Sequence, residues 1–345
     1  MNIRELFRRL LAWISGDASR PAPTRRVLVA IPDADATAAS HIVTSLSATG
    51  VHVDALAASG ADVGDRLDAA SGYDVILVVD RNSEEEDGRI LELTEAIHSR
   101  QSAPIVVVDD ARTNEELLEI LEHRHVQQIL ALSQPRVLEW LGHTVNTILT
   151  RGQFDFAVFS GGAEVVSYEV RSSRQRDELV TALRTYAEGA GIHRRIVDVA
   201  CGVADEFIIN AVYNAPVDKD GHRLYRNQDR TEHVDLGDDA VARFSFACDG
   251  KWLAIAIRDP FGSITDETLR DYLVRCLRGG DEQIEQKAGG AGLGLYQILR
   301  AVNAFVVNIV PGQATEMIGL LSVDGSYRQF ARQPKSILIS VRDEA

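Results

Sequence analysis

The most concentrated group of glycines in the sequence is the run from Gly289 to Leu295, which reads Gly-Gly-Ala-Gly-Leu-Gly-Leu. Glycines let backbone N–H groups come close to an anion, and a helix that begins at such a loop adds partial positive charge. Two common phosphate-binding loops are excluded, because a polar segment (281–287) rather than a buried strand precedes the run and no Gly-Lys-Ser/Thr closes it. The run therefore predicts either a phosphate-binding loop of a third kind or a tight turn.

Residues that could serve a nucleotide stand on both sides of this loop. Glu206 and Asn210 are four residues apart in a predicted helix over 194–214, so both side chains project from one helical face. Asp259 ends a predicted strand, and Thr315 precedes another. Each of these residues alone also fits a solvated helix face or a turn cap, so the argument for chemistry depends on finding all of them in one order.

That order resembles the GHKL ATPase superfamily, which includes sensor histidine kinases and anti-sigma serine kinases. Over residues 165–323 the chain has a helix with Glu-x-x-x-Asn-Ala, a strand followed by Asp-x-x-Gly, the Gly-x-Gly-Leu-Gly-Leu loop and a Thr before a strand. The resemblance implies an α/β two-layer sandwich over 153–345 that binds ATP and Mg²⁺. The lead-in to the helix is most similar to the short anti-sigma type.

The resemblance also implies a role for each matching residue. Asn210 would hold the Mg²⁺ that bridges the ATP phosphates, and Glu206 would be the general base. Asp259 would accept a hydrogen bond from the adenine amino group, and Thr315 would support the adenine site. The remaining nucleotide-binding positions would be Gly262, Gly290, Gly292, Leu293 and Gly294.

One departure from the family concerns the turn after Asp259. The family usually reads Asp-x-Gly-x-Gly, but Phe261 and Ser263 occupy the two glycine positions here, with Gly262 between them. A bulky Phe261 could narrow the pocket or stack beside the base. The departure leaves the affinity for adenine and the identity of the nucleotide open.

The first half of the chain has a different pattern, in which apolar runs alternate with helical segments. A run without alternation is typical of a parallel strand that is buried on both faces. The runs lie at 27–31, 75–79, 105–108 and 129–132, and the helical segments near 37–48, 84–99 and 113–123. The alternation predicts a doubly wound, flavodoxin-like sheet over 26–134.

The spacing in this region resembles the receiver domain of bacterial response regulators, with Asp80 at the position of the phosphoacceptor. The acidic pair that holds magnesium in receivers falls on Ile31 and Pro32, and the Thr or Ser that ends the fourth strand is Asp109. The Lys-Pro after the fifth strand is missing. A phosphoacceptor needs a cation to offset charge on the phosphoryl group, so Asp80 is expected to be vestigial and the region to be an interaction module.

The other segments connect or precede these two regions. The sequence predicts an amphipathic, arginine-rich helix over 1–16, a linker over 17–25 and a connector helix over 135–152. The basic helix would bind an anionic membrane surface or a partner helix, or it would dock on its own chain or on a second copy in a homo-oligomer. A further strand is predicted at 154–158, and a polar segment is expected to lead into the glycine loop.

Composition narrows the possible functions. The net charge of −15 argues against general nucleic-acid binding, since no basic surplus exists to neutralise phosphates. Three scattered cysteines and the lack of a long apolar run predict a cytoplasmic protein without a disulfide framework, a zinc site or a membrane span. Together with this composition, the resemblances to GHKL ATPases and to receiver domains imply a bacterial signalling protein that binds ATP and Mg²⁺ and phosphorylates or regulates a protein partner. The alternative is a non-catalytic scaffold in which both folds have lost their chemistry.

Overall fold

The computed structural model describes residues 25–31, 36–57, 67, 72–79, 89–110, 114–278 and 293–342. The predicted helix over 1–16 lies outside the described residues, as do Asp80, Gly290 and Gly292.

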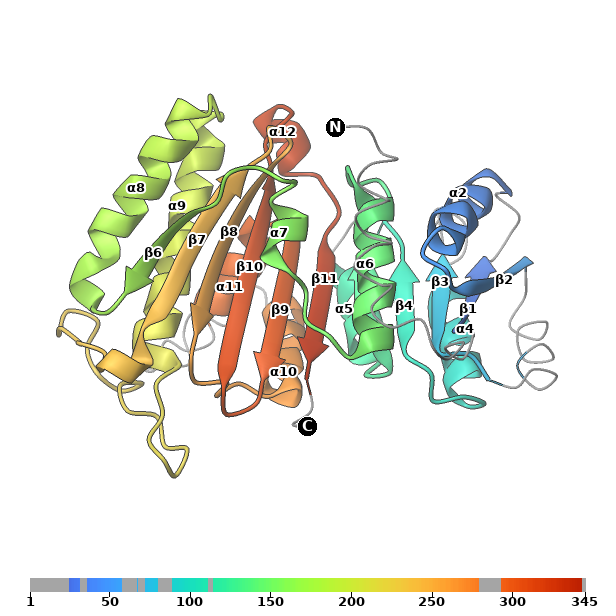
Figure 1. The fold of residues 1–345 in the computed structure, drawn as a ribbon, viewed down its shortest axis with the longest axis horizontal. Helices are drawn as coiled ribbons and strands as arrows, with labels where there is room; N and C mark the ends of the chain where they lie inside the picture. Colours follow the sequence, from blue (N-terminus) through green and yellow to red (C-terminus); the bar gives the residue numbers. More distant parts are fainter. Residues whose placement is uncertain are drawn as a thin grey trace, which may run out of the picture.

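Eleven strands form one continuous sheet in the order β2-β1-β3-β4-β5-β11-β9-β10-β8-β7-β6 (Figure 1). The five strands from the first half of the chain are parallel to one another. In the second half, neighbouring strands are antiparallel except for β11 and β9, which are parallel. The molecule is therefore a mixed α/β protein, and we call these two parts of the sheet the parallel half and the antiparallel half.

The parallel half follows the apolar runs of the sequence. Its strands are β1 (Arg26–Ile31), β2 (His52–Ala57), β3 (Val75–Val79), β4 (Ile105–Val108) and β5 (Val126–Leu130), and its helices are α2 (Ala36–Ser47), α4 (Arg89–His98) and α5 (Asn114–Glu122). Every residue of β3 and β4 is buried, as expected for strands covered on both faces. The strands predicted at 27–31, 75–79 and 105–108 are confirmed, whereas β5 begins three residues before the predicted run at 129–132 and ends two residues before the end of that run. The edge strand β2 had no such run to mark it.

The antiparallel half contains most of the predicted elements of the second region. Its strands are β6 (Val166–Val170), β7 (Ala242–Cys248), β8 (Trp252–Asp259), β9 (Ala304–Val310), β10 (Ala314–Ser322) and β11 (Ser336–Val341). Its main helices are α8 (Arg176–Gly189), α9 (Arg194–Ile209), α10 (Asp266–Arg278) and α11 (Leu293–Ala301), with a short α12 (Tyr327–Phe330). A helix, α10, lies between β8 and the glycine loop, where the sequence indicated only a polar segment.

Two apolar cores lie on the two faces of this sheet, and each extends across both halves. Side chains of α4, α5, α8, α9, α10 and α11 pack on one face. Those of α2, α6 (Val137–Thr150) and α7 (Phe156–Phe159) pack on the other (Figure 1). None of the described helices is long and apolar enough to cross a membrane.

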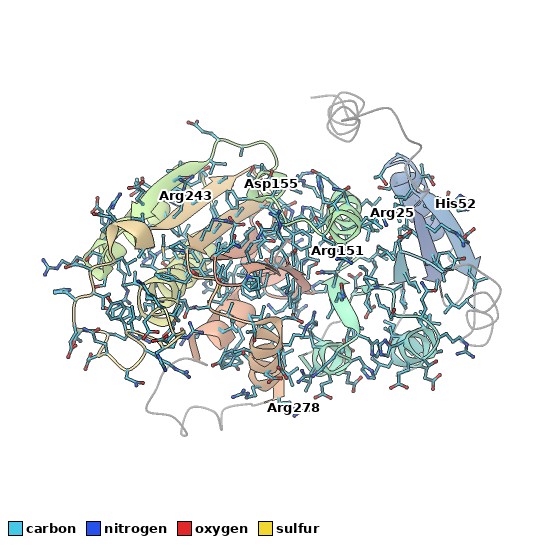
Figure 2. All side chains as sticks on the ribbon, turned by 60° about the horizontal axis from the view of Figure 1, so that its bottom comes forward. Arg25, His52, Arg151, Asp155, Arg243 and Arg278 are labelled. Carbon is cyan, nitrogen blue, oxygen red and sulfur yellow. The ribbon has the colours of Figure 1, made fainter. Side chains whose placement is uncertain are left out.

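The strand predicted at 154–158 is wrong, because this segment contains the short helix α7. Asp155, labelled in Figure 2, precedes the helix with an extended backbone. Its carboxylate accepts a hydrogen bond from the Ala157 N–H at 2.9 Å. The cap satisfies a donor that the first turn of a helix leaves open. A short apolar run cannot by itself distinguish a strand from a buried helical turn.

The two halves meet where β5 pairs with β11, and the regular ladder there is short. Only Ile129 with Ile337 and Gln128 with Leu338 are in register. The buried Gln128 side chain continues the ladder, since its amide donates to the Ile339 carbonyl oxygen at 2.6 Å and accepts from the Ile339 N–H at 2.7 Å. A side-chain amide therefore replaces backbone pairing at this junction.

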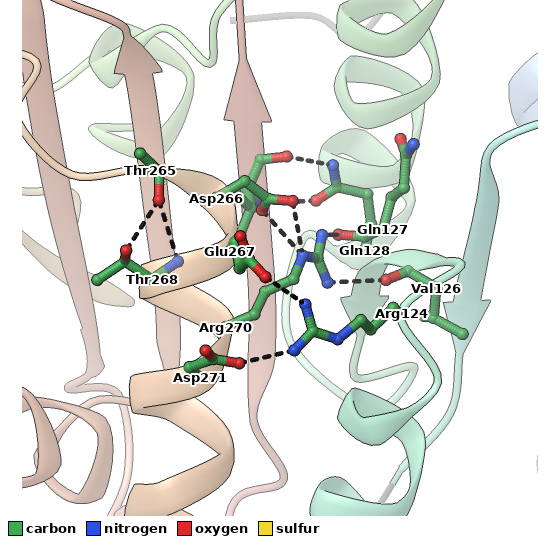
Figure 3. A network of polar contacts seen from close by, with 11 residues as sticks. Arg124, Val126, Gln127, Gln128, Thr265, Asp266, Glu267, Thr268, Arg270 and Asp271 are labelled. Carbon is green, nitrogen blue, oxygen red and sulfur yellow. Dashed lines mark hydrogen bonds and ion pairs between the residues drawn. The ribbon is translucent and has the colours of Figure 1, made fainter.

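Arg270 of α10 completes the same junction from one face of the sheet (Figure 3). Its guanidinium donates to the carbonyl oxygen of Val126 at 2.9 Å and bonds both carboxylate oxygens of Asp266. The residue is 7% exposed, so it satisfies a buried backbone acceptor at the start of β5. Three exposed ion pairs between described residues accompany it: Arg124 with Asp271, Arg124 with Glu267, and Arg278 with Glu122.

Candidate functional site

A cleft in the antiparallel half brings together residues that are far apart in the sequence. It lies between the end of α9, the helices α10 and α11, and the strands β8 and β10. Its walls carry Asn210, Asn214, Arg223, Arg226, Asp259, Ser263, Thr268, Tyr272, Leu295 and Thr315. Three of the predicted nucleotide-binding residues, Asn210, Asp259 and Thr315, therefore line one cavity.

Asp259 and Thr315 are directly opposite each other in the pairing of β8 with β10. Both side chains are buried, at 7% and 3% exposure. The Asp259 carboxylate accepts a hydrogen bond from the Phe261 N–H at 3.0 Å. Burial nevertheless raises the pKa of Asp259 to about 6, because it disfavours the charged form more than the nearby N–H groups favour it. The cleft thus contains a buried carboxyl group that titrates just below neutral pH.

Asn210 begins a π-helical turn, η2 (Asn210–Asn214), which continues α9. The Ala215 N–H donates to the Asn210 carbonyl oxygen at 2.8 Å, five residues back along the chain. Single π-turns within helices are frequent at functional sites. The predicted helix over 194–214 is thus present, but its last turn is wider than an α-helix and brings the Asn210 and Asn214 side chains together.

Glu206 lies one turn before Asn210 on α9 and faces the first turn of α11. A Cβ atom on Gly294 would overlap the Glu206 carboxylate, so only a glycine allows this approach. Burial raises the pKa of Glu206, and the neighbouring Asp205 raises it further against the opposing effects of Arg176 and Arg230. A half-buried carboxylate of raised pKa is suited to accepting a proton.

The turn after Asp259 shows how the chain accommodates its departure from Asp-x-Gly-x-Gly. Gly262 has a φ of +57°, and a Cβ there would overlap the Val310 carbonyl oxygen. Ser263 lines the cleft, whereas Phe261 does not. Phe261 is therefore not one of the residues that line the cleft, in contrast to the expectation that its ring could narrow the pocket.

Three arginines of the polar loop over 215–238 were not identified from the sequence. Arg223 donates to the Ser263 hydroxyl at 2.6 Å and to its carbonyl oxygen at 2.8 Å, and it also bonds the Asn214 carbonyl oxygen. Arg226 lines the cleft and forms no ion pair with any residue in the described part of the chain. Arg230 bonds the Asn214 side chain. The spacing of these arginines is irregular, so only their number in an acidic protein could have indicated them.

The other predicted residues are only partly described. Leu293 begins α11, but its side chain lies outside the described residues, as do Gly290, Gly292 and Asp80, the residue expected at the phosphoacceptor position.

A second groove lies on the opposite face of the same strands. It is lined by Arg243 and Arg258, by Glu316, and by Asp155 at the start of α7. Among the predicted site residues, only Asp259 borders both cavities. The first cleft therefore remains the better candidate, since it contains Asn210 and Thr315 as well.

No protein-family model matches this sequence, and no curated protein matches it. Among solved structures, a protein from Bacillus anthracis str. Sterne described as a diacylglycerol kinase aligns with 94% of this chain and 99% of its own at 11% identity. The TM-score of that alignment is 0.26, so the likeness has no bearing on what this chain does.

Proposed function

We propose that this chain is a bacterial signalling protein that binds ATP with Mg²⁺ in the cleft of the antiparallel half and regulates or phosphorylates a protein partner. The observation that supports the proposal most is the convergence of Asn210, Asp259 and Thr315 on one cavity. These residues come from three separate elements, and each is a residue to which the resemblance to GHKL ATPases assigns a role in nucleotide binding. On this proposal the antiparallel half is a GHKL-type ATP-binding domain and the parallel half a receiver-like module.

The residues present fit this ligand pair. Mg²⁺ takes oxygen ligands and usually keeps waters and phosphates in its shell, so the single amide oxygen of Asn210 is a sufficient protein contribution. Asp259 offers a buried acceptor for an amino group, beside Thr315 on the neighbouring strand. Arg226 supplies a cation that could compensate phosphate charge.

Glu206 would act on the group that attacks the nucleotide. ATP with Mg²⁺ supplies a phosphoryl group that can pass to a hydroxyl group or to water. Glu206 would take the proton from that attacking oxygen, and its raised pKa makes it a stronger base. Gly294 leaves the space that the carboxylate occupies.

The first test is a calorimetric titration of ATP with Mg²⁺ into the wild type and Asn210→Ala. We expect Asn210→Ala to weaken binding by about tenfold or more, in the range seen when groups around a bound metal are lost. Asn146→Ala, on α6 and outside the cleft, is the matched control and should bind as the wild type does. Equal binding by the wild type and Asn210→Ala would remove Asn210 from the site.

A second test separates transfer from binding. Glu206→Gln should abolish transfer of label from ATP to a partner or to water while ATP still binds. Gly294→Ala should reduce transfer as well, because its new methyl group must displace the Glu206 carboxylate. Transfer that survives Glu206→Gln would exclude Glu206 as the base.

A non-catalytic scaffold is the second candidate, and one observation favours it. Several polar groups of the cleft bond one another, since Arg223 binds Ser263 and Asn214 binds Asn210. Such a network could stabilise a fold that no longer binds nucleotide. A wild-type protein that gives no heat with ATP and Mg²⁺ would establish this candidate over the first.

A further inference from the structure

The π-helical turn that ends α9 holds two asparagine side chains in contact. The Asn214 amide nitrogen donates to the Asn210 side-chain oxygen at 2.7 Å, and both residues line the cleft. A side-chain amide has an acceptor oxygen on one arm and a donor nitrogen on the other, and the two arms have nearly the same shape. The contact alone therefore does not determine which arm of Asn210 faces Asn214.

Arg230 removes this ambiguity, because a guanidinium can only donate hydrogen bonds. It donates to the Asn214 side-chain oxygen at 3.0 Å. The nitrogen of Asn214 must then face Asn210, and Asn210 must present its oxygen in return. One donor-only side chain thus fixes two amides in series.

Arg230 is itself held in place, and its position costs stability. Its guanidinium lies over the Tyr213 ring at 4.6 Å from the centroid, and the Tyr213 hydroxyl donates to the Glu232 carbonyl oxygen at 2.7 Å. The Nη1 nitrogen of Arg230 is buried without a hydrogen-bond partner among the described residues. An unsatisfied buried donor is unfavourable for folding and calls for another explanation, such as a role in the site.

We propose that Arg230 and Asn214 are positioning residues that hold the Asn210 side chain with its oxygen, not its nitrogen, available to a divalent cation. The inference rests on the proposed function, because it assigns a cation to Asn210. Mg²⁺ binds oxygen and not an amide N–H, so an inverted Asn210 could not be its ligand. The Asn210 oxygen accepts one bond from Asn214 and keeps a second lone pair for the metal.

The test compares the affinity for ATP in Mg²⁺ with the affinity in EDTA, measured by calorimetry on the full chain. We expect the wild type to bind ATP more tightly in Mg²⁺. Asn214→Leu is close in size and uncharged, and it should reduce this Mg²⁺-dependent gain about tenfold with little change in EDTA. Arg230→Met should also reduce the gain, because Asn214 is then free to turn and no longer holds the Asn210 oxygen toward the cation.

The control is Asn227→Leu, which makes the same substitution at an exposed position of the same loop and should leave the gain unchanged. Thermal unfolding of each variant checks that it is folded. An unchanged Mg²⁺-dependent gain in both Asn214→Leu and Arg230→Met would overturn the positioning role while leaving ATP binding intact. A wild type that binds no ATP in either condition would instead overturn the proposed function, and the cation role with it.

The hydrogen bonds from Arg230 to Asn214 and from Asn214 to Asn210 can also be tested in the free protein, without nucleotide. The Asn214 side-chain amide, assigned in NMR spectra by its loss in Asn214→Leu, should have one proton protected from exchange by its bond to Asn210. Arg230→Met should remove that protection, because Asn214 is then free to turn. Protection that persists in Arg230→Met would show that Arg230 does not fix the amides.

Discussion

The parallel and antiparallel halves share one sheet and two continuous cores, but they use polar residues at their strand ends in different ways. In the parallel half, the Asp110 carboxylate beyond β4 accepts a hydrogen bond from the Ser133 N–H at 2.8 Å and so connects two loops. In the antiparallel half, Asp259 and Thr315 instead face a cavity. The first arrangement stabilises the fold, whereas the second keeps a buried carboxyl group of raised pKa beside open space.

This difference indicates where ligand chemistry is to be expected. A buried ionisable group costs stability unless it is paired, and proteins concentrate such groups at functional sites. The comparison predicts that substitutions in the parallel half and where it meets the antiparallel half lower the stability and leave ATP binding unchanged. A substitution of the buried carboxyl group in the cleft should instead raise the stability and weaken ATP binding. Four experiments test that contrast.

We expect the largest change in stability from a substitution of Arg136, which connects the start of α6 to the antiparallel half. Its guanidinium pairs with Glu139 at 2.7 Å and with Asp249 at 2.9 Å, and it bonds the Val158 carbonyl oxygen at 2.8 Å. Arg136→Ala would leave two partly buried carboxylates without their cation, so we expect the free energy of unfolding to fall by about 3 kcal/mol. Urea denaturation measures this change.

Arg151 provides the matched control for Arg136. Both arginines have a positive φ, at 67° and 50°, and they flank the same helix α6. Arg151 is exposed and forms no ion pair with any described residue, so Arg151→Ala should change the stability by less than about 0.5 kcal/mol. Equal losses in the two variants would mean that the ion pairs of Arg136 contribute nothing to the stability.

The second effect is a gain in stability at the cleft. The folded pKa of Asp259 is about 6, above its unfolded value, so the folded state binds more protons between about pH 4 and pH 6 and stability falls as the pH rises through that range. Asp259→Asn removes the penalty. It should raise the free energy of unfolding by about 2–3 kcal/mol at pH 7, with little gain at pH 4.

Asp259→Asn should also weaken ATP binding, because the adenine amino group then loses the carboxylate that would accept its hydrogen bond. Urea denaturation at several pH values and calorimetry together measure this exchange. The contrast between the halves fails at this site if Asp259→Asn destabilises the protein at pH 7, or if it leaves ATP binding unchanged.

The third effect concerns the junction between the halves. Arg270→Met keeps the apolar stem of the side chain but leaves the Val126 carbonyl oxygen without its donor, so we expect a loss of about 2 kcal/mol. Arg278→Met removes an exposed pair across the same interface, with Glu122, and should cost less than about 1 kcal/mol. If the two variants lose the same stability, burial of Arg270 does not decide the strength of the junction.

The sequence predicts those features of the fold that depend on local composition. Buried parallel strands are continuous apolar runs, so β1, β3 and β4 could be identified directly. The apolar run at 129–132 marked only the end of β5, which also contains Gln127 and Gln128. The edge strand β2 and the helix α10 lack such runs. The junction of β5 with β11 depends on Gln128 and Arg270, whose hydrogen-bond partners lie far away in the sequence. Such long-range contacts leave no periodic pattern in the sequence, so the junction could not be predicted.

The site divides in the same way. Asn210, Asp259 and Thr315 could be selected because their order resembles a known family, and the cleft does bring them together. The register that places Asp259 opposite Thr315 is a tertiary property, as is the π-helical turn at Asn210. Arg230 was missed because its role depends on hydrogen bonding to Asn214, in a loop whose sequence indicates only polarity.

The smallest effect should separate structural from ligand-binding carboxylates. Asp110→Ala removes the acceptor for the Ser133 N–H, which water can partly replace, so we expect a loss of about 1 kcal/mol or less. Asp110→Asn keeps an acceptor oxygen and should lie within about 0.5 kcal/mol of the wild type. Both variants should bind ATP with Mg²⁺ as the wild type does. None of the described residues of the parallel half lines the cleft. Weaker ATP binding in Asp110→Ala would therefore contradict the contrast, because it would show that a strand end of the parallel half also affects the ligand.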